Sequence, residues 1–209
     1  MIGETVFVSG LAMFAGAPLA GILSSKMDLR VMLLIGFVGF ATSTWMLTGM
    51  TADWDFQELL VPQMLRGMSL MLCMVPINNL ALGTLSADKM KGASGLYNLT
   101  RNLGGAVGLA VINTLLSDRS ALHYQRLSDA INWTNTIALE QLNAMAANLA
   151  ARGVDGETGA LAQMAARLHG QAAVMSFIDI FTLITALFGG LALAALLMRP
   201  AASGGGSGH

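Results

Sequence analysis

Cysteine and charge are both scarce in this chain of 209 residues. The single cysteine, Cys73, excludes an intrachain disulfide and any metal site built on several thiolates. Only 11% of the residues are charged, whereas a typical soluble domain has roughly 25%. The 11 lysines and arginines are scattered and the formal net charge is -1, so no nucleic-acid partner is expected.

The chain instead contains several long runs of apolar residues. Hydrophobic residues make up 55% of the chain, and a helix needs about 20 apolar residues to cross a bilayer. Five stretches reach about this length. The sequence therefore predicts an all-α membrane protein with four transmembrane helices within residues 1–116 and a fifth near the end, at about residues 5–23, 31–50, 59–82, 92–116 and 172–198.

The short connectors between these runs predict an orientation, because Lys and Arg are retained on the cytoplasmic side. Residues 24–30 and 86–92 each carry two basic residues, whereas residues 51–56 carry two aspartates and no basic residue. We expect the first two connectors inside and the third outside. The N-terminus is then outside and the C-terminus is cytoplasmic.

One segment, residues 117–171, is polar enough to be extracytoplasmic. Apolar residues near helical spacing predict an amphipathic helix over residues 134–152, and residues 160–169 suggest a second short helix. Two interpretations stay open, a solvated hairpin over the membrane surface or a docking surface for another protein. The glycine- and serine-rich residues 199–209 predict a disordered cytoplasmic tail. The histidines of the outer segment lack ligand-like spacing, so no metal site is expected.

Three charged residues fall inside the predicted spans, namely Arg66, Arg101 and Asp179. An ionised group at the centre of a span costs at least about 2.5 kcal/mol on insertion scales, so it needs a partner or a watery cavity. The helical rise places Arg66 and Asp179 at similar depth, which allows an ion pair. Asn98 and Asn102 lie on the same helix as Arg101. These residues either hold helices together or line a polar path.

Prolines and glycines mark two of the predicted spans. Pro62 and Pro76 are expected to interrupt the third span, and broken backbone is tolerated at depth only against protein or a cavity. In the fourth span, Gly104, Gly105 and Gly108 include a small-xxx-small spacing that lets another helix approach closely.

Several segments resemble one family. Residues 21–30, Gly-Ile-Leu-Ser-Ser-Lys-Met-Asp-Leu-Arg, look like the second-half copy of the signature loop of the major facilitator superfamily. Residues 62–67 followed by Pro76 resemble the span two helices later, and residues 93–108 are the most specific match. Together they are similar to the fourteen-span drug/proton antiporters of the EmrB/QacA type.

This resemblance implies a fold and a function. The chain would be the last five helices of a multidrug efflux antiporter in a bacterial inner membrane, driven by the proton gradient without a cofactor and without enzyme activity. Its partners would be the remaining N-terminal helices, the lipid bilayer, and a periplasmic adaptor protein with an outer-membrane channel.

The same resemblance implies roles for particular residues. Gly21, Lys26, Asp28 and Arg30 would form a gating loop, although Ser25 stands where the family often has an acidic residue. Polar pathway or substrate-cavity positions would be Arg66, Asn98, Arg101, Asn102 and Asp179.

Two other classes of function remain open. One is a small non-transporting membrane scaffold or regulator that acts through its extracytoplasmic segment. The other is a membrane-embedded enzyme, which needs acid/base or metal-binding residues converging at one depth, and no such cluster is visible in the sequence.

Overall fold

The computed structural model describes residues 2–51, 53–83, 87–130, 136–151, 153 and 155–197. Within these ranges the regular structure is helical and no strand occurs. The predicted tail, residues 199–209, lies outside them. The elements in chain order are α1 (Ile2–Lys26), α2 (Leu29–Met46), a short 3₁₀ turn η1 (Leu47–Gly49), α3 (Phe56–Leu82), α4 (Ala87–Ala130), α5 (Thr136–Ala150) and α6 (Gly156–Leu197).

Four segments among the described residues are long and apolar enough to cross a membrane, namely Phe7–Lys26, Leu29–Gly49, Phe56–Leu82 and Gly156–Leu197. The prediction of an all-α membrane protein is confirmed. Helix α4 is not among the four. The fourth predicted span therefore stays a prediction.

The chain divides into two compact units. The first contains residues 1–49, 53–107 and 181–209, and the second contains residues 50–52 and 108–180. The two long helices α4 and α6 each contribute to both units.

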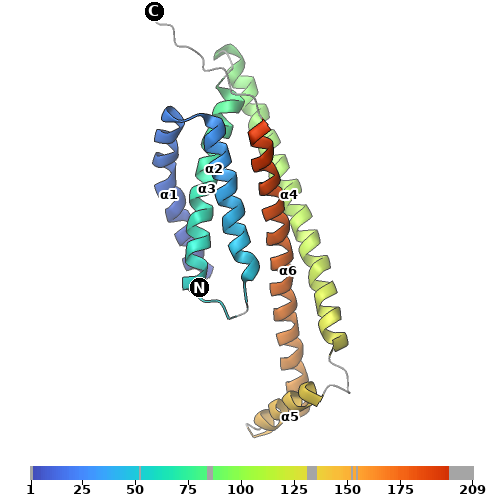
Figure 1. Cartoon of the computed structure of the whole chain (residues 1–209). Helices are drawn as coiled ribbons and strands as arrows, with labels where there is room; N and C mark the ends of the chain where they lie inside the picture. Colours follow the sequence, from blue (N-terminus) through green and yellow to red (C-terminus); the bar gives the residue numbers. More distant parts are fainter. Residues whose placement is uncertain are drawn as a thin grey trace, which may run out of the picture. The chain divides into compact units, whose positions relative to one another are not determined.

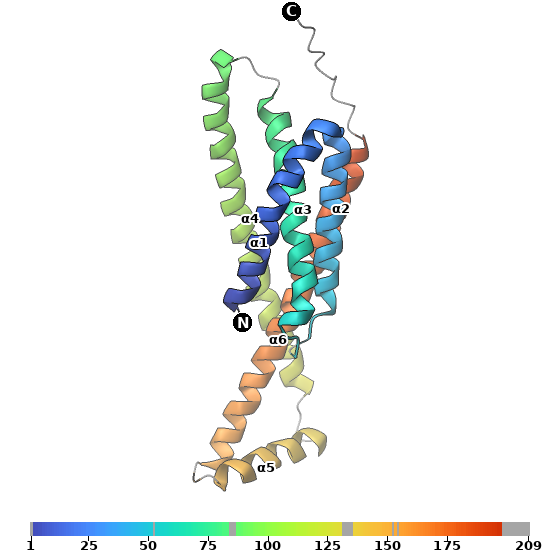
Figure 2. The ribbon, with the colours of Figure 1, turned by 90° about the vertical axis from the view of Figure 1, so that its left-hand side faces the viewer.

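In the first unit, α3 lies between α1 and α2 and packs against both (Figures 1 and 2). Helix α3 is continuous although Pro62 and Pro76 lie inside it, so the predicted interruption is wrong. Both prolines are buried, and packed neighbouring helices are one means by which a membrane helix tolerates the backbone groups that proline frees. At its start, Glu58 accepts a hydrogen bond from the Asp55 backbone N–H at 3.0 Å.

Glycines set the closest approaches around α3. A Cβ built at Gly67 would lie 2.7 Å from the backbone oxygen of Ser9 on α1. On the other side, a Cβ at Gly36 of α2 would lie 2.6 Å from Cys73 Sγ, and one at Gly39 would collide with Ser69 Oγ. Small residues let membrane helices approach closely enough for extensive van der Waals contact.

The last part of α6 packs antiparallel on α2 within the same unit. Phe188 stacks on Phe40 with ring centroids 4.2 Å apart, and the hydroxyl oxygens of Thr44 and Thr185 are 2.9 Å apart. An open apolar pocket of about 460 Å³ lies beside this seam, lined by residues of α2, α3 and α6 that include Leu33, Ile77 and Leu191.

In the second unit, α5 falls within the range predicted for an amphipathic helix and lies across the beginning of α6 (Figure 2). The flanking segments differ from the prediction. Residues 117–130 continue α4, and residues 160–169 belong to α6 instead of forming a separate short helix. Residues 117–130 contain no glycine or proline that could end the helix. Gly153 has φ 75°, a left-handed conformation that favours glycine, between α5 and α6.

Candidate functional site

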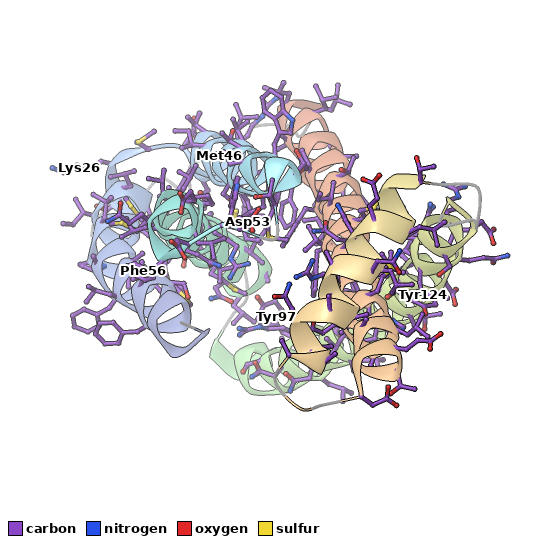
Figure 3. The ribbon with its side chains drawn as sticks, turned by 90° about the horizontal axis from the view of Figure 1, so that it is seen from below. Lys26, Met46, Asp53, Phe56, Tyr97 and Tyr124 are labelled. Carbon is purple, nitrogen blue, oxygen red and sulfur yellow. The ribbon has the colours of Figure 1, made fainter. Side chains whose placement is uncertain are left out.

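The loop predicted to act as a gate joins α1 to α2 at one end of the first unit. Lys26 is exposed and extends away from the helices in Figure 3. Asp28 precedes α2 but makes no side-chain capping bond. Ser25 Oγ donates to the backbone oxygen of Ile22 at 2.8 Å, inside its own helix.

Arg30 connects this loop to the end of another helix. Its Nε donates a hydrogen bond of 2.8 Å to the backbone oxygen of Ala195. That oxygen is one of the last four carbonyls of α6, which have no partner within the helix. A cation at a helix C-terminus is also favoured by the helix dipole. Arg30 therefore ties the start of α2 to the last turn of α6.

A second polar position lies on α3. The Arg66 side chain is half-buried, and no hydrogen bond or ion pair joins it to any other described residue. Three residues earlier on the same helix, Gln63 Oε1 is buried and has no hydrogen-bond partner among the described residues. Two neighbouring polar groups without partners inside a membrane-spanning helix require water or another polar group.

Helix α4 meets α3 through a single side-chain hydrogen bond near its start. The Tyr97 hydroxyl donates to Asn78 Oδ1 at 2.6 Å, and Tyr97 is labelled in Figure 3. Beyond this bond, every residue from 98 to 111 on α4 is exposed. The predicted polar residues Asn98, Arg101 and Asn102 are all within this stretch.

The exposed stretch of α4 has two different sides. At 3.6 residues per turn, Asn98, Arg101 and Asn102 share one side. Leu99 and Leu103 lie on the other, where they are 65% and 64% exposed. Lipid can cover the leucine side, but a guanidinium and two amides facing lipid would be costly. We call the side formed by residues 98, 101, 102, 105 and 108 the polar face of α4.

The three glycines of α4 have no neighbour. A Cβ built at Gly104, Gly105 or Gly108 meets nothing within 4 Å. Their predicted role in close helix packing is therefore not fulfilled by any described part of this chain, and it stays a prediction that requires another helix.

Asp179 binds different partners from the one the sequence suggested. Its Oδ2 lies 2.9 Å from His123 Nε2 and 3.6 Å from an Arg119 nitrogen. Similar depth allows an ion pair of Asp179 with Arg66, but the described contacts of Asp179 are with His123 and Arg119. The difference arises because α4 continues past residue 116 and carries Arg119 and His123, one turn apart, alongside α6 within the second unit.

The sequence analysis does not predict His123 and Arg119 as site residues, because it places residues 117–171 in an extracytoplasmic segment. A signal was present, since residues 109–130 contain neither glycine nor proline and Arg119 and His123 are spaced i, i+4. A further contact between α4 and α6 is the stacking of the Tyr124 and His169 rings, whose centroids are 3.9 Å apart. Tyr124 is labelled in Figure 3.

Comparison with known proteins decides the family. The sequence profile described as Major Facilitator Superfamily matches residues 1–119. The chain belongs to the major facilitator superfamily. This confirms the family predicted from the signature loop and from residues 93–108, and the family is one of transporters rather than enzymes.

Three relatives illustrate the similarity. The colistin resistance protein EmrB of Acinetobacter baumannii is 33% identical over 183 residues, covering 88% of this chain and 36% of the relative. The fatty acid resistance protein FarB of Neisseria gonorrhoeae is 29% identical, covering 92% and 37%. The multidrug export protein EmrB of Escherichia coli K12 is 26% identical, with the same coverage of 92% and 37%. The chain thus spans roughly a third of the length of these relatives. No solved structure gives a significant match.

Proposed function

We propose that this chain is the C-terminal portion of a proton-coupled multidrug efflux antiporter that exports amphipathic drugs across the bacterial inner membrane. The names of its relatives include multidrug export and resistance to colistin or fatty acids, which supports an export function for this member of the superfamily. The N-terminus lies outside and the C-terminus in the cytoplasm.

The polar face of α4 is the observation that carries this proposal. Asn98, Arg101 and Asn102 are exposed in the middle of a helix of a membrane protein, where lipid is an unfavourable environment for them. Transporters of this kind bind cargo near the bilayer midplane between two structural halves. The polar face supports a role as one wall of that cavity, and the open glycines support close contact with helices of the other half.

The mechanism involves no covalent change in the cargo and no cofactor. Inward proton flow drives a change between inward-open and outward-open states, and the drug leaves in exchange. The hydrogen bond from Arg30 to Ala195 supports a latch at the cytoplasmic end, because it must break if α2 and α6 separate there. Arg66 and Gln63 are further candidates for the polar interior.

The proposal also names partners. The remaining N-terminal helices of the transporter complete the cavity, and Leu99 and Leu103 of α4 face the lipid bilayer. Residues 117–171 are proposed to meet a periplasmic adaptor protein that leads to an outer-membrane channel. The aromatic and histidine side chains of Tyr124 and His169 line an open pocket of about 570 Å³ in that segment's unit.

The test is drug resistance in a pump-deficient bacterial host. The full-length protein that contains this chain is expected to lower the accumulation of a lipophilic cationic dye. Arg101→Ala should abolish that effect at normal membrane expression, because the variant removes the charge from the polar face. Leu103→Ala on the opposite side is the matched control and should export normally. Normal export by Arg101→Ala would remove the polar face from the site.

A further inference from the structure

In the second unit, a histidine and an aspartate far apart in sequence are joined. His123 of α4 and Asp179 of α6 form a 2.9 Å contact between Nε2 and Oδ2. The His123 side chain is only 9% exposed, whereas the Asp179 side chain is 36% exposed. An enclosed imidazole is thus attached to a carboxylate that reaches the surroundings.

The contact with Asp179 determines which nitrogen of the His123 imidazole carries the hydrogen. An ionised carboxylate only accepts hydrogen bonds, so Nε2 carries the hydrogen that it donates to Asp179. In the neutral imidazole, Nδ1 then holds a lone pair. Nδ1 of His123 is buried and has no hydrogen-bond partner among the described residues. Buried polar atoms are nearly always partnered, so Nδ1 requires a partner other than the described residues in their present arrangement, and water or a proton can supply the missing interaction.

We propose that His123 and Asp179 form a proton-binding site of the transport cycle, in which the proton is taken up at Nδ1 of His123. This rests on the proposed function, because it assigns the driving proton of that antiporter to this chain. Uptake breaks one O–H bond of a hydronium ion on the outer side and forms one N–H bond at Nδ1. Release on the cytoplasmic side breaks that N–H bond and returns the proton to water.

Proton uptake at this position has a structural consequence. The contact with Asp179 becomes a charge-assisted hydrogen bond between imidazolium and carboxylate, which is stronger than the neutral form. At the same time Nδ1 changes from an acceptor into a donor that still has no acceptor in the present arrangement. The protonated site therefore favours a rearrangement of α4 against α6 in which Nδ1–H finds a partner.

The charges around His123 suit this role. Asp179 faces it from α6, and Arg119, one turn earlier on α4, lies 3.6 Å from the same carboxylate oxygen. Arg119 and Asp179 cancel each other, so proton uptake changes the charge of the site from zero to positive. The other charged side chains described on α4, α5 and α6 in this unit are exposed, namely Asp118, Arg126, Asp129, Glu140, Asp155, Glu157 and Arg167.

The position along the helix fits proton entry. Residues 180–197 of α6 follow Asp179, close to the ~20 residues that cross the hydrocarbon. In the proposed orientation Asp179 is then at the outer boundary, where protons enter. Histidine is also the side chain that ordinarily changes charge between about pH 5 and 8.

The experiment uses the full-length transporter in proteoliposomes and two assays with one lipophilic cationic dye. The first assay measures dye accumulation driven by a pH gradient, and the second measures exchange of internal for external dye without a gradient. We expect His123→Gln to reduce gradient-driven accumulation to that of protein-free vesicles and to leave dye exchange intact. Asp118→Asn, an exposed carboxylate beside Arg119, is the control and should behave as wild type in both assays.

Two results would overturn the proton site. One is gradient-driven accumulation by His123→Gln at the wild-type level. The other is loss of dye exchange together with accumulation, which would mean that His123 only supports the structure.

If His123→Gln is not recovered in the membrane, Asp179→Asn gives a second test. Loss of the carboxylate removes the charge-assisted contact with the imidazolium, so gradient-driven accumulation should fall while dye exchange persists. Accumulation at the wild-type level by Asp179→Asn contradicts the proposal. Absence of dye exchange in the unaltered transporter would instead overturn the proposed function.

Discussion

Glycines occur on two sets of helices in this chain, and what covers them differs. Around α3, side chains added at Gly39 or Gly67 would collide with atoms of the neighbouring helix. On α4, side chains added at Gly104 or Gly108 would meet nothing within 4 Å. The first set is used within the chain, where it brings α1, α2 and α3 together. The second set meets no described part of this chain and is open to the approach of a further helix.

The polar residues follow the same division. Ser69, which faces Gly39, is buried where α2 and α3 pack together. Asn98 and Arg101, on the same helix as the α4 glycines, are exposed. A small residue next to a buried neighbour indicates packing. A small residue next to exposed polar side chains, in a helix of a membrane protein, indicates a missing partner or water.

The largest expected effect comes from filling a closed glycine. Gly67→Leu places a side chain against the backbone oxygen of Ser9 and against Ala12 Cβ, 2.7 and 3.0 Å from the new Cβ. Overpacking of this kind typically costs about 1–3 kcal/mol, and a backbone neighbour cannot move aside cheaply. The free energy of unfolding in mixed micelles measures the loss. Gly104→Leu is the control and should leave stability within about 0.5 kcal/mol. An equal loss of unfolding free energy in both variants would contradict the difference between the two sets of glycines.

Filling an open glycine should damage transport without damaging the fold. Gly108→Leu in the full-length protein is expected to abolish dye export while the level of protein in the membrane stays normal, because the new side chain blocks the approach of the partner helix. Resistance of a pump-deficient host is the measurement. Export at the wild-type level by Gly108→Leu would show that no helix packs there.

A smaller effect is expected at the α2–α6 seam. Thr44→Val removes the hydroxyl that lies 2.9 Å from Thr185 Oγ1, and such bonds between membrane helices average about 0.6 kcal/mol. A double-mutant cycle with Thr185→Val isolates the coupling between the two side chains. Thr42→Val is the control, since Thr42 bonds only to Val38 of its own helix. Equal coupling energies of Thr42 and Thr44 with Thr185 would contradict a hydrogen bond between Thr44 and Thr185.

The smallest effect concerns pH at the start of α6. The pKa of Asp155 lies below its ordinary value, chiefly because the Thr158 side chain donates a hydrogen bond to its carboxylate. A group whose pKa falls on folding stabilises the folded state above its unfolded pKa of about 3.9, and this is lost as the pH falls through the folded value. The protection of the Glu157 and Thr158 amides from exchange, relative to their intrinsic rates at each pH, should therefore fall in acid. Asp155→Asn should remove that pH dependence of the protection, and an unchanged pH dependence in the variant would contradict this assignment.

Much of the fold could be predicted from apolar runs, because a membrane span leaves a long uninterrupted signal. Helices α1, α2 and α3 overlap residues 5–23, 31–50 and 59–82. The prolines of the third span misled the prediction, since a proline weakens an isolated helix but is tolerated once neighbouring helices pack against it. Periodicity carries no information about such tertiary compensation.

The site was harder to predict for a different reason. The charge at Asp179 could be identified because charge is rare in spans, but its partner His123 is 56 residues away in sequence. Choosing that partner required knowing that α4 does not end near residue 116. The closed glycines at 36, 39 and 67 were also missed, because a glycine in an apolar helix gives no indication of which neighbour it faces.

The most direct test of the account is the environment of the polar face of α4 in the full-length transporter with Cys73 replaced by serine. Spin labels at Asn98, Asn102 and Gly105, compared with labels at Leu99 and Leu103, would be probed with oxygen, which concentrates in lipid, and with a water-soluble nickel complex. We expect low oxygen accessibility on the polar face and high oxygen accessibility at both leucines. Equal oxygen accessibility on the two sides would mean that lipid covers the polar face, and would contradict the account.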